Sequence, residues 1–442
     1  MPNQAAQQSP SSEPAVNNRG FVFLNITQFF GAANDNILKQ LLMFGLASGG
    51  IWAGQMGKGG QAIASLCLAI PFVLFSGFAG QFSDRFSKRD VSIAVKLSEV
   101  MIAVIALFGL WIENVWVVLA AMVLISLQST FFTPAKFGII PEILPANKLS
   151  RANGTLNMFT YIAVILGGAV GGPLYAAYAP DLDKFPDAVR MVWLPGVILL
   201  VVGILGTAAS FGLPKLSSKN PDLKIRPILF RPYFETWREI SGTPVASVIV
   251  AWSYFYFILG GLAIMILPDY KELLDISYFQ ASILLAILGI AIGIGDYIAG
   301  RISHHQIRHD LIPIGIIGTT ASFFVLGVIP PNYWLVAVCL SCCGFMAGFF
   351  MVPLQTMIQH FTSEKKRGQV LGLWSCCSFL GIIIGNVLFI AIKQTGIDSN
   401  RVFLVCGVLG LIGVAAYFLH WKKIFSDAID GEKVGELADE PA

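Results

Sequence analysis

The chain has 442 residues, of which 55% are hydrophobic and only 12% are charged, and its mean hydropathy is +0.72. A soluble domain carries about 25% charged residues, so this composition excludes a soluble globular protein and predicts a helical membrane protein with many spans. The net charge of +3 says little about partners, and we expect no nucleic acid among them. Of the seven cysteines, only Cys339 and Cys342 have CxxC spacing, and both lie within a predicted span, so the cysteines predict small core residues rather than a disulfide or metal framework.

Residues 1–20 are rich in Gln, Ser, Pro and Asn, and they predict a disordered tail without a secretory signal. Twelve apolar segments follow, and they predict membrane-spanning helices in two bundles of six. The first bundle, 21–212, comprises about 21–48, 59–83, 91–112, 115–142, 150–178 and 190–212; the second, 245–420, comprises about 245–268, 279–300, 311–329, 333–359, 368–393 and 401–420. A basic linker at 213–244 contains Pro214, Pro221, Pro227 and Pro232, which disfavour one continuous helix, and 421–442 form a second tail.

The distribution of basic residues predicts the orientation in the membrane. If the amino terminus is cytoplasmic, the cytoplasmic segments hold twenty Lys and Arg residues and the outer segments hold six. The positive-inside rule therefore predicts that both termini are cytoplasmic, and we expect a multi-pass protein of the bacterial inner membrane.

The two halves resemble each other in sequence. Phe131-Phe132-Thr133-Pro134 near the end of the fourth span is echoed by Phe349-Phe350-Met351-Val352-Pro353 in the tenth. Gly154 follows the first proline by twenty residues, and Gly372 follows the second by nineteen. A repeat of six spans predicts a substrate site between two bundles.

The first span contains the strongest candidate site. On a helix that begins near Phe21, Asp35 lies roughly 21 Å along the axis, near the bilayer centre. Ionisable residues at that depth usually face a cavity and mark a functional site, although Asp35 and Lys39 could instead neutralise each other at i,i+4 spacing. The polar residues that share an arc of about 100° on this helix are Asn25, Gln28, Asp35, Asn36 and Lys39.

Two later spans add candidates. Ser129, Thr133 and Lys136 share a face of the fourth span, where Lys136 could meet a phosphate or the Asp35 carboxylate, or snorkel to the interface. Gln355 in the tenth span could line the cavity or bond to a neighbouring backbone. No nucleophile elbow, phosphate loop or nucleotide fingerprint is present, so we expect neither an enzyme nor a cofactor, and we expect no metal site.

The loop after the second span resembles a family signature. Gly80-x-x-x-Asp84-Arg85-x-x-Lys88-Arg89 is similar to the signature between the second and third helices of the major facilitator superfamily, with Ser87 where that family usually has glycine. A degenerate echo, Asp296 to Arg301, follows the eighth span. The resemblance implies an all-α membrane protein with the major facilitator fold of twelve helices.

In this reading four residues form a conformational latch. The glycine permits close helix approach, and the aspartate pairs with a basic group or a helix end in a contact that re-forms as the bundles rock. The latch residues are Gly80, Asp84, Arg85 and Arg89.

A narrower resemblance rests on the first and fourth spans. The segment 28–36 resembles the "QF-x-x-A-F-x-DN" first helix of the bacterial lysophospholipid transporter family, and 134–142 resembles its "PAKYGIL-x-E" segment. Segments 149–154 and 348–354 also fit. The resemblance implies inward flipping of lysophospholipids such as lysophosphatidylethanolamine across the inner membrane by alternating access. A separate cytoplasmic acyltransferase would then re-acylate the lipid.

The family likeness implies that Asp35, Asn36 and Lys136 handle the substrate, with Gln28, Lys39 and Gln355 as further expected contacts. One departure is that 245–268 has no basic residue where relatives have an arginine in the seventh helix. The aromatic residues of that span could instead border the acyl path. The alternatives are a proton-coupled solute or drug exporter with Asp35 as the proton carrier, and a membrane scaffold. We expect a monomer.

Overall fold

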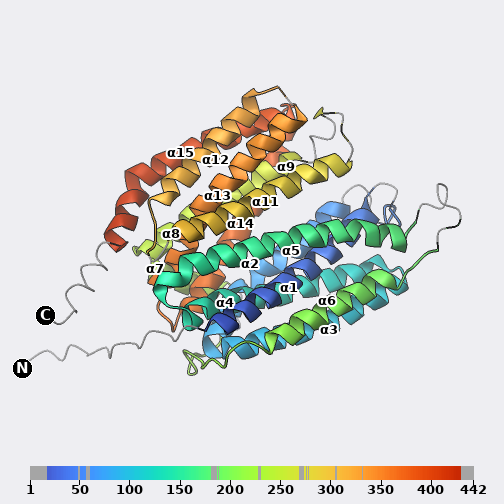
Figure 1. Cartoon of the computed structure of the whole chain (residues 1–442), viewed down its shortest axis with the longest axis horizontal. Helices are drawn as coiled ribbons and strands as arrows, with labels where there is room; N and C mark the ends of the chain where they lie inside the picture. The colour runs from blue at the N-terminus through green and yellow to red at the C-terminus, as the bar shows by residue number, and fades with distance from the viewer. Residues whose placement is uncertain are drawn as a thin grey trace, which may run out of the picture.

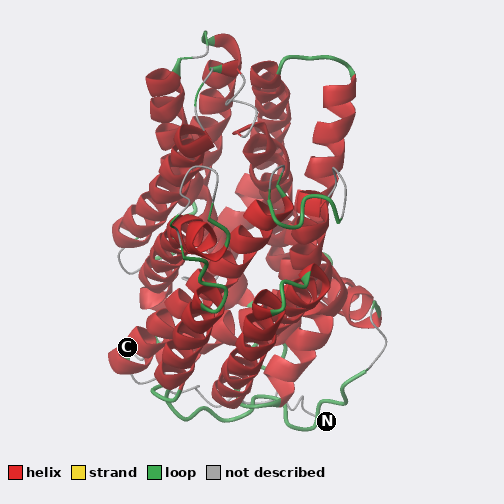
Figure 2. Ribbon diagram, turned by 90° about the vertical axis from the view of Figure 1, so that its right-hand side faces the viewer, coloured by secondary structure: helices red, strands yellow, loops and turns green. Residues whose placement is uncertain are grey.

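The computed structural model describes residues 17–47, 50–55, 60–180, 187, 189–226, 230–267, 273–274, 276, 278–303, 306–330 and 332–429. Within these ranges the chain is helical and contains no strand (Figure 2). The predicted tails lie mostly outside the described residues, although the first helix begins at Asn18 and the last ends at Ile429. Both ends of the described chain lie at the same end of the molecule, which we call the terminal end, and the opposite end is the far end (Figure 1).

The helices form two bundles that follow the two halves of the chain (Figure 1). The first bundle comprises α1 (Asn18–Leu46), α2 (Gly60–Arg85), α3 (Lys88–Trp111), α4 (Val115–Ile143), α5 (Leu149–Tyr178) and α6 (Leu194–Ser210). The second comprises α8 (Pro244–Tyr256), which continues through a π-helical turn (Phe257–Ala263) into α9 (Ile264–Ile266), then α11 (Tyr278–Ile302), α12 (Leu311–Val328), α13 (Tyr333–Phe361), α14 (Arg367–Gln394) and α15 (Val402–Ala416), which ends in a second π-helical turn (Tyr417–Trp421). The predicted all-α, two-bundle fold is confirmed.

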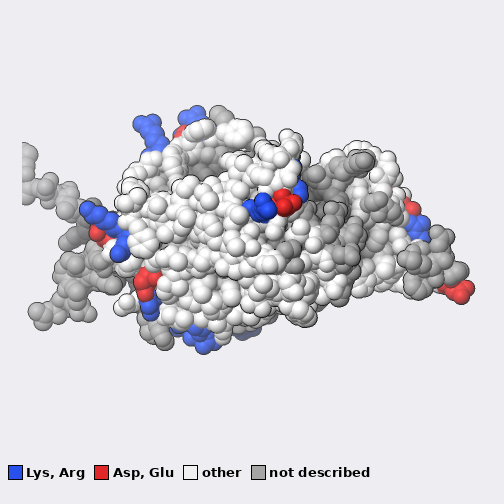
Figure 3. Space-filling view, turned by 90° about the horizontal axis from the view of Figure 1, so that it is seen from above, with Lys and Arg blue, Asp and Glu red and all other residues white. Residues whose placement is uncertain are grey.

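Ten of the described helices are long and apolar enough to cross a membrane. The helix α6 is shorter, and α1, although 29 residues long, is interrupted by its polar residues. Counting both gives the twelve spans that the sequence predicts, and this number stays a prediction. Charged side chains are sparse over the face shown in Figure 3, where, apart from one blue and red group near the middle, they lie toward its edges and ends.

The helices begin where side chains can cap them. Asn114 accepts hydrogen bonds from the backbone N–H groups of residues 116 and 117 at the start of α4, and Asn332 does the same for residues 334 and 335 at the start of α13. Such caps satisfy backbone donors that a helix leaves free. The two caps stand at corresponding places in the two halves.

Two seams join the bundles, α2 against α14 and α5 against α11. The hydrogen bonds between the bundles lie in the terminal half of these helices and of α4 and α13. Farther from the terminal end, on the α2–α14 seam, Phe72 stacks on Phe379 with 4.1 Å between the ring centroids. Farther along α14, Ile384 is 58% exposed and Val387 is 61% exposed. The molecule is therefore closed at its terminal end.

The repeat is visible in the backbone contacts at these seams. A Cβ on Gly154 would lie 2.3 Å from the carbonyl oxygen of Asp296, and one on Gly372 would lie 2.2 Å from that of Ser76. Only glycine permits these approaches, so the two positions that the sequence pairs occupy equivalent places.

Close backbone contacts also show which residue after the eighth span corresponds to Gly80 of the loop signature. A Cβ on Gly80 would lie 2.4 Å from the Gly368 carbonyl oxygen, and one on Gly300 would lie 2.6 Å from that of Ser150. Gly300, rather than Asp296, is thus the counterpart of Gly80. The structural repeat lies four residues later than the sequence comparison indicates.

Candidate functional site

The polar residues of α1 divide between packing and a half-buried face. Asn25 donates to the Phe21 carbonyl and is buried, and Asn36 donates to the Ala32 carbonyl. Asp35, Asn36 and Lys39 remain partly exposed. The first span therefore offers a short polar surface near its middle.

Asp35 is bound to the fourth span. Its Oδ2 accepts a hydrogen bond of 2.7 Å from the Ser129 hydroxyl of α4, and its Oδ1 has no hydrogen-bond partner. Asp35 and Lys39 form no ion pair, and the Lys39 ammonium has no acidic or hydrogen-bonding partner among the described residues. The carboxylate and the ammonium thus do not neutralise each other within the helix.

Lys136 points from α4 toward α1. Its ammonium donates to the Gln28 Oε1 at 3.1 Å and lies over the rings of Phe132 and Phe137, 5.8 and 4.9 Å from their centroids. The Gln28 amide in turn donates to Thr160 of α5 at 3.1 Å. Lys136 is therefore held by a neutral amide and aromatic faces, with no ion pair to an acid in the described chain.

A buried ion pair stands behind this site, and sequence reasoning missed it. Lys96 and Glu99 of α3 lie 2.6 Å apart and are 1% and 0% exposed. Asn34 donates to Glu99 at 2.9 Å, and Gln128 donates both to Glu99 at 3.3 Å and to Ser129 at 3.2 Å. Hydrogen bonds therefore connect Glu99 to Asp35 through two side chains of α4. Two opposite charges at i,i+3 within a span are the signal that could have revealed the pair.

Gly31 makes room for that ion pair. A Cβ on Gly31 would lie 2.2 Å from the Lys96 ammonium nitrogen, inside any possible contact distance. The ammonium also lies 4.9 Å from the centroid of the Phe132 ring. The glycine in the first-span motif thus lets α3 deliver its lysine beside α1.

Two of the four predicted latch residues lie at the α2–α14 seam. Asp84 is fully buried, and its carboxylate accepts from the backbone N–H groups of Gly368 and Gln369 at 2.6 and 3.0 Å. It therefore caps the first turn of α14 from the opposite bundle, where the helix dipole favours a negative charge. Gly80 provides the close approach described above.

The two arginines of the signature do not reach this contact. Arg89 donates to the Leu213 carbonyl at 2.9 Å, beyond the end of α6. The Arg85 guanidinium lies 5.5 Å from the centroid of the Phe86 ring. In this conformation neither arginine pairs with Asp84.

Gln355 of α13 lies against α5 where the two bundles meet, apart from Asp35 and Lys136. It is 1% exposed, accepts from Asn157 at 2.9 Å and donates to Asn153 at 3.2 Å. Asn153 also donates to Gln359 at 2.7 Å. These amides of α5 and α13 form a hydrogen-bonded lock between the bundles.

Asp296 of α11 lies beside this lock. Its side chain is fully buried, and neither carboxylate oxygen has a hydrogen-bond partner. Asn157 faces it from α5, and Tyr161 and Tyr256 approach it from α5 and α8. This acid sits where the two bundles must separate if the terminal end opens.

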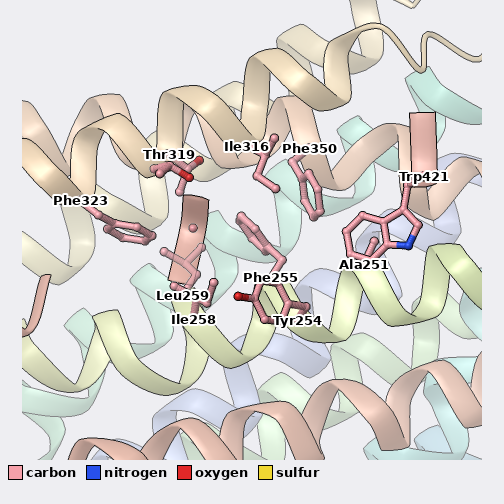
Figure 4. Close-up of a pocket in the computed structure, with 12 residues that line it drawn as sticks. Ala251, Tyr254, Phe255, Ile258, Leu259, Ile316, Thr319, Phe323, Phe350 and Trp421 are labelled. Atoms are coloured by element: carbon pink, nitrogen blue, oxygen red, sulfur yellow. The ribbon is translucent and has the colours of Figure 1, made fainter. Parts of the chain in front are cut away.

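Two of the cavities among the described helices differ greatly in size. A cavity of about 20 Å³ lies inside the second bundle, between α8, α12 and α13, where Phe255 and Phe350 point toward each other (Figure 4). That volume holds about one water molecule, so this part of the aromatic seventh span does not enclose an acyl chain. Trp252 and Tyr256 of the same span instead stack on each other at 5.2 Å.

The larger cavity is an apolar groove of about 640 Å³ between α2, α3 and α4. Its walls include Met101, which is 70% exposed, and the phenyl rings of Phe82 and Phe131. Gln128, the residue that links Glu99 to Ser129, also lines it. An apolar groove on the outside of the bundle thus ends against the polar network inside.

No group of three or more His, Cys, Asp or Glu residues able to hold a metal ion occurs among the described residues. Of the loop histidines that the sequence offers as weak metal ligands, His304 and His305 lie outside those residues.

Comparison with known proteins supports the architecture. The family model described as Major Facilitator Superfamily matches residues 22–385 and 307–433. Among solved structures, the human organic anion transporter MFSD10 is similar with a TM-score of 0.72 at 13% identity, over 90% of this chain and 98% of that one. A bacterial homologue of the iron transporter ferroportin, in an outward-facing state, is similar with a TM-score of 0.66 at 13% identity, over 91% and 99%.

Two similar curated proteins are each named lysophospholipid transporter LplT. The protein of Yersinia enterocolitica is 25% identical over 367 residues, which cover 80% of this chain and 82% of the relative. The protein of Cronobacter sakazakii is 26% identical over 361 residues, covering 80% and 83%. With its two helical bundles, its polar site between α1 and α4 and a family model that matches most of its length, the chain belongs to the Major Facilitator Superfamily of membrane transporters.

Proposed function

We propose that this transporter flips lysophospholipids, such as lysophosphatidylethanolamine, inward across the bacterial inner membrane by alternating access. The names of its relatives and the first-span and fourth-span motifs support this substrate class. A separate cytoplasmic acyltransferase would then re-acylate the transported lysophospholipid.

The orientation follows from the basic residues. The terminal end carries the linker and the loops that hold most of the Lys and Arg residues, so the positive-inside rule assigns it to the cytoplasm. The closed end is then the cytoplasmic end. A transporter closed at that end would take its substrate from the other side of the membrane.

The observation that supports a phosphate-bearing substrate best is the imbalance of charge at the site. Lys96 is ion-paired with Glu99, whereas Lys136 donates to a neutral amide and has Asp35 near it without an ion pair, and Lys39 has neither an ion pair nor a hydrogen bond among the described residues. A half-buried ammonium without an acid attracts an anionic group, and phosphate suits it because it offers several acceptor oxygens. Asp35, 2.7 Å from Ser129, would then meet the amine of an ethanolamine headgroup.

The acyl chain requires an apolar path next to this headgroup site. The groove between α2, α3 and α4 has the volume and the apolar walls for one chain, and Gln128 connects it to the polar network. We propose that the chain stays in contact with this side of the first bundle while the headgroup occupies the site between α1 and α4.

A second candidate function is proton-coupled export of a solute or drug. It is favoured by the hydrogen-bonded path from Glu99 through Gln128 and Ser129 to Asp35, since linked acids within a membrane are typical of proton relays.

The test is uptake of labelled lysophosphatidylethanolamine by proteoliposomes that contain wild type, Lys136→Ala or Lys136→Gln, with equal protein incorporation. We expect wild-type uptake that a protonophore does not change, and a loss of about tenfold or more in both variants, because a charge-assisted hydrogen bond to phosphate is removed. Lys423→Gln, which removes an exposed charge from the end of the last helix, serves as the matched control and should retain uptake.

Two results would decide against the proposal. Uptake that is unchanged in the Lys136 variants would remove the phosphate site. Absence of lysophospholipid uptake, together with drug efflux that collapses with the proton gradient and with Asp35→Asn, would establish the exporter.

A further inference from the structure

The linker contains a short amphipathic helix, α7 (Arg231–Ile240), at the terminal end (Figure 1). Phe230, Phe234 and Trp237 recur at i, i+4 and i+7, and they are 53%, 74% and 38% exposed. Aromatic side chains in such a row form one apolar stripe, which is unusual on a surface that faces water.

The charged residues of α7 are ordered around this stripe. On a wheel of 100° per residue, Glu235 and Glu239 lie roughly 150° from the aromatic stripe, and Arg231 and Arg238 lie between the two. If α7 lies along the membrane interface, its aromatic residues enter the bilayer, its arginines meet the headgroups and its acids face water.

The buried face of α7 fixes the helix at the α2–α14 seam. The Tyr233 hydroxyl donates to the Val73 carbonyl at 2.8 Å and accepts from the Gly77 N–H at 2.9 Å, both on α2. Tyr233 also contacts Cys376 of α14. The tyrosine therefore bridges the two bundles.

The depth of this contact agrees with an interfacial position. Gly77 precedes the end of α2, Arg85, by eight residues, which corresponds to roughly 12 Å along the helix. The aromatic stripe of α7 is thus held beside the outer turns of α2 and α14, where headgroups meet acyl chains.

Further contacts of the linker, 213–244, join it to both bundles. Glu239 pairs with Lys366 at the start of α14 at 2.7 Å, and Lys219 pairs with Glu364 at 3.0 Å. On the side of the first bundle, Ser218 donates to the Arg85 carbonyl at 2.6 Å. These contacts can all be kept only while the terminal end is closed.

The charge of the linker indicates which lipids it meets. Residues 213–244 contain six basic and three acidic side chains. Glu235 is engaged by Arg226 and Arg231, and the hydrogen bond from Arg231 lowers the pKa of this acid. Arg238 has no ion pair among the described residues, which leaves it available to an external anion.

We propose that α7 is an interfacial helix that binds anionic lipid headgroups of the leaflet at the terminal end and, through Tyr233, links that binding to closure of the α2–α14 seam. The ligand is the anionic bilayer surface, and its binding stabilises the closed α2–α14 seam, which we call the gate. This inference is independent of the transported substrate, because neither of its tests measures transport.

The first test locates Trp237. The full chain is reconstituted into vesicles that contain brominated phospholipid, and the fluorescence of Trp237→Phe is subtracted from that of wild type to isolate this residue among nine tryptophans. We expect the difference signal to be quenched by bromines near the headgroup and shielded from aqueous iodide. Quenching by iodide with no response to brominated lipid would show that α7 faces water or a soluble partner, and it would overturn the proposal.

The second test measures lipid selectivity and the link to the gate. Purified full-length protein is titrated with phosphatidylglycerol or phosphatidylcholine, and the rise in Tm is recorded for wild type, Arg238→Gln, Tyr233→Phe and the control Lys423→Gln. We expect a rise with phosphatidylglycerol only, about fivefold weaker apparent affinity in Arg238→Gln and no change in the control.

Tyr233→Phe separates binding from the gate. Loss of the hydroxyl contacts should keep the quenching of Trp237 by lipid but remove most of the rise in Tm. Equal responses to both lipids in every protein would overturn the proposal, as would a Tyr233→Phe protein that keeps the full rise.

Discussion

At the scale of single residues, the site depends on which charges have partners. Lys96 and Glu99 are fully buried and matched, whereas Lys136 and Asp35 are held by neutral groups and remain partly exposed. The ion pair of Lys96 and Glu99 forms the wall of the site, whereas Asp35 and Lys136, which form no ion pair, can bind a ligand. This division explains how one membrane bundle tolerates four ionisable groups close together.

The ion pair behind the site gives a stability prediction. Glu99→Gln should lower the free energy of unfolding by about 3–5 kcal/mol, because it leaves the Lys96 ammonium buried without an acid. The double variant Lys96→Met with Glu99→Gln should recover most of that loss, since both charges are gone. Thermal unfolding in detergent measures the two values, and a double variant no more stable than the single one would contradict the matched pair.

Gly31 gives a prediction about space rather than charge. Gly31→Ala places a methyl group 2.2 Å from the Lys96 ammonium nitrogen, so the lysine must shift, which disturbs its ion pair with Glu99. We expect a loss of about 1–3 kcal/mol in stability, measured by thermal unfolding, together with reduced uptake. Gly168→Ala in α5 is the control, because a Cβ there meets nothing within 4 Å, and equal effects of the two changes would contradict this account.

At the scale of helices, the terminal end is closed by helix ends that one bundle caps for the other. The Asp84 carboxylate of α2 bonds to the first turn of α14, and amides of α5 bond to amides of α13. Such contacts can break as a unit when the bundles rock, because each joins two rigid helices rather than residues within one.

The cap on α14 can be tested directly. Asp84→Ala should weaken the closed terminal end by about 1–2 kcal/mol, the usual cost of removing a side-chain cap. Labels on the terminal ends of α2 and α14, followed by electron spin distance measurements, should then show a second population with a larger separation. Arg85→Ala is the control, since Arg85 does not reach the seam. A distance distribution that stays unchanged in Asp84→Ala would argue against the latch.

The acid at the other seam leads to the opposite expectation. Burying a carboxylate without a partner is costly, and Asp296→Asn offers an amide of nearly the same shape. We therefore expect Asp296→Asn to have a Tm equal to or higher than that of wild type, whereas Asp296→Leu should lower it because the shape changes. A marked loss of Tm in the asparagine variant would show that the carboxylate has a structural partner.

At the scale of the whole molecule, the sequence was sufficient for the fold because apolar runs and basic loops report on the membrane directly. The wheel of the first span also placed Asp35 and Gln28 on one polar face, and in the structure these side chains bond to α4 and α5. The repeat located Gly154 and Gly372 at equivalent seam positions, since close backbone approach leaves glycine as its mark.

Other features depended on tertiary contacts that no local pattern encodes. The face of α13 that holds Gln355 reads equally well as cavity or contact, and only the position of α5 decides for the contact. Lys96 and Glu99 stand at i,i+3 in one apolar span, but the hydrogen bonds that Glu99 accepts from α1 and α4 depend on how those helices pack. The prolines of the linker hid α7, whose place is fixed by the reach of Tyr233 into the seam.

The most direct test of the central claim compares two ligands that differ in the phosphate. Binding of lysophosphatidylethanolamine and of a monoacylglycerol with the same acyl chain is measured on purified wild type and Lys136→Ala. We expect wild type to prefer the phospholipid by about tenfold or more, and we expect Lys136→Ala to lose this preference while it keeps its affinity for the monoacylglycerol. Equal preference for the phospholipid in both proteins would contradict this expectation.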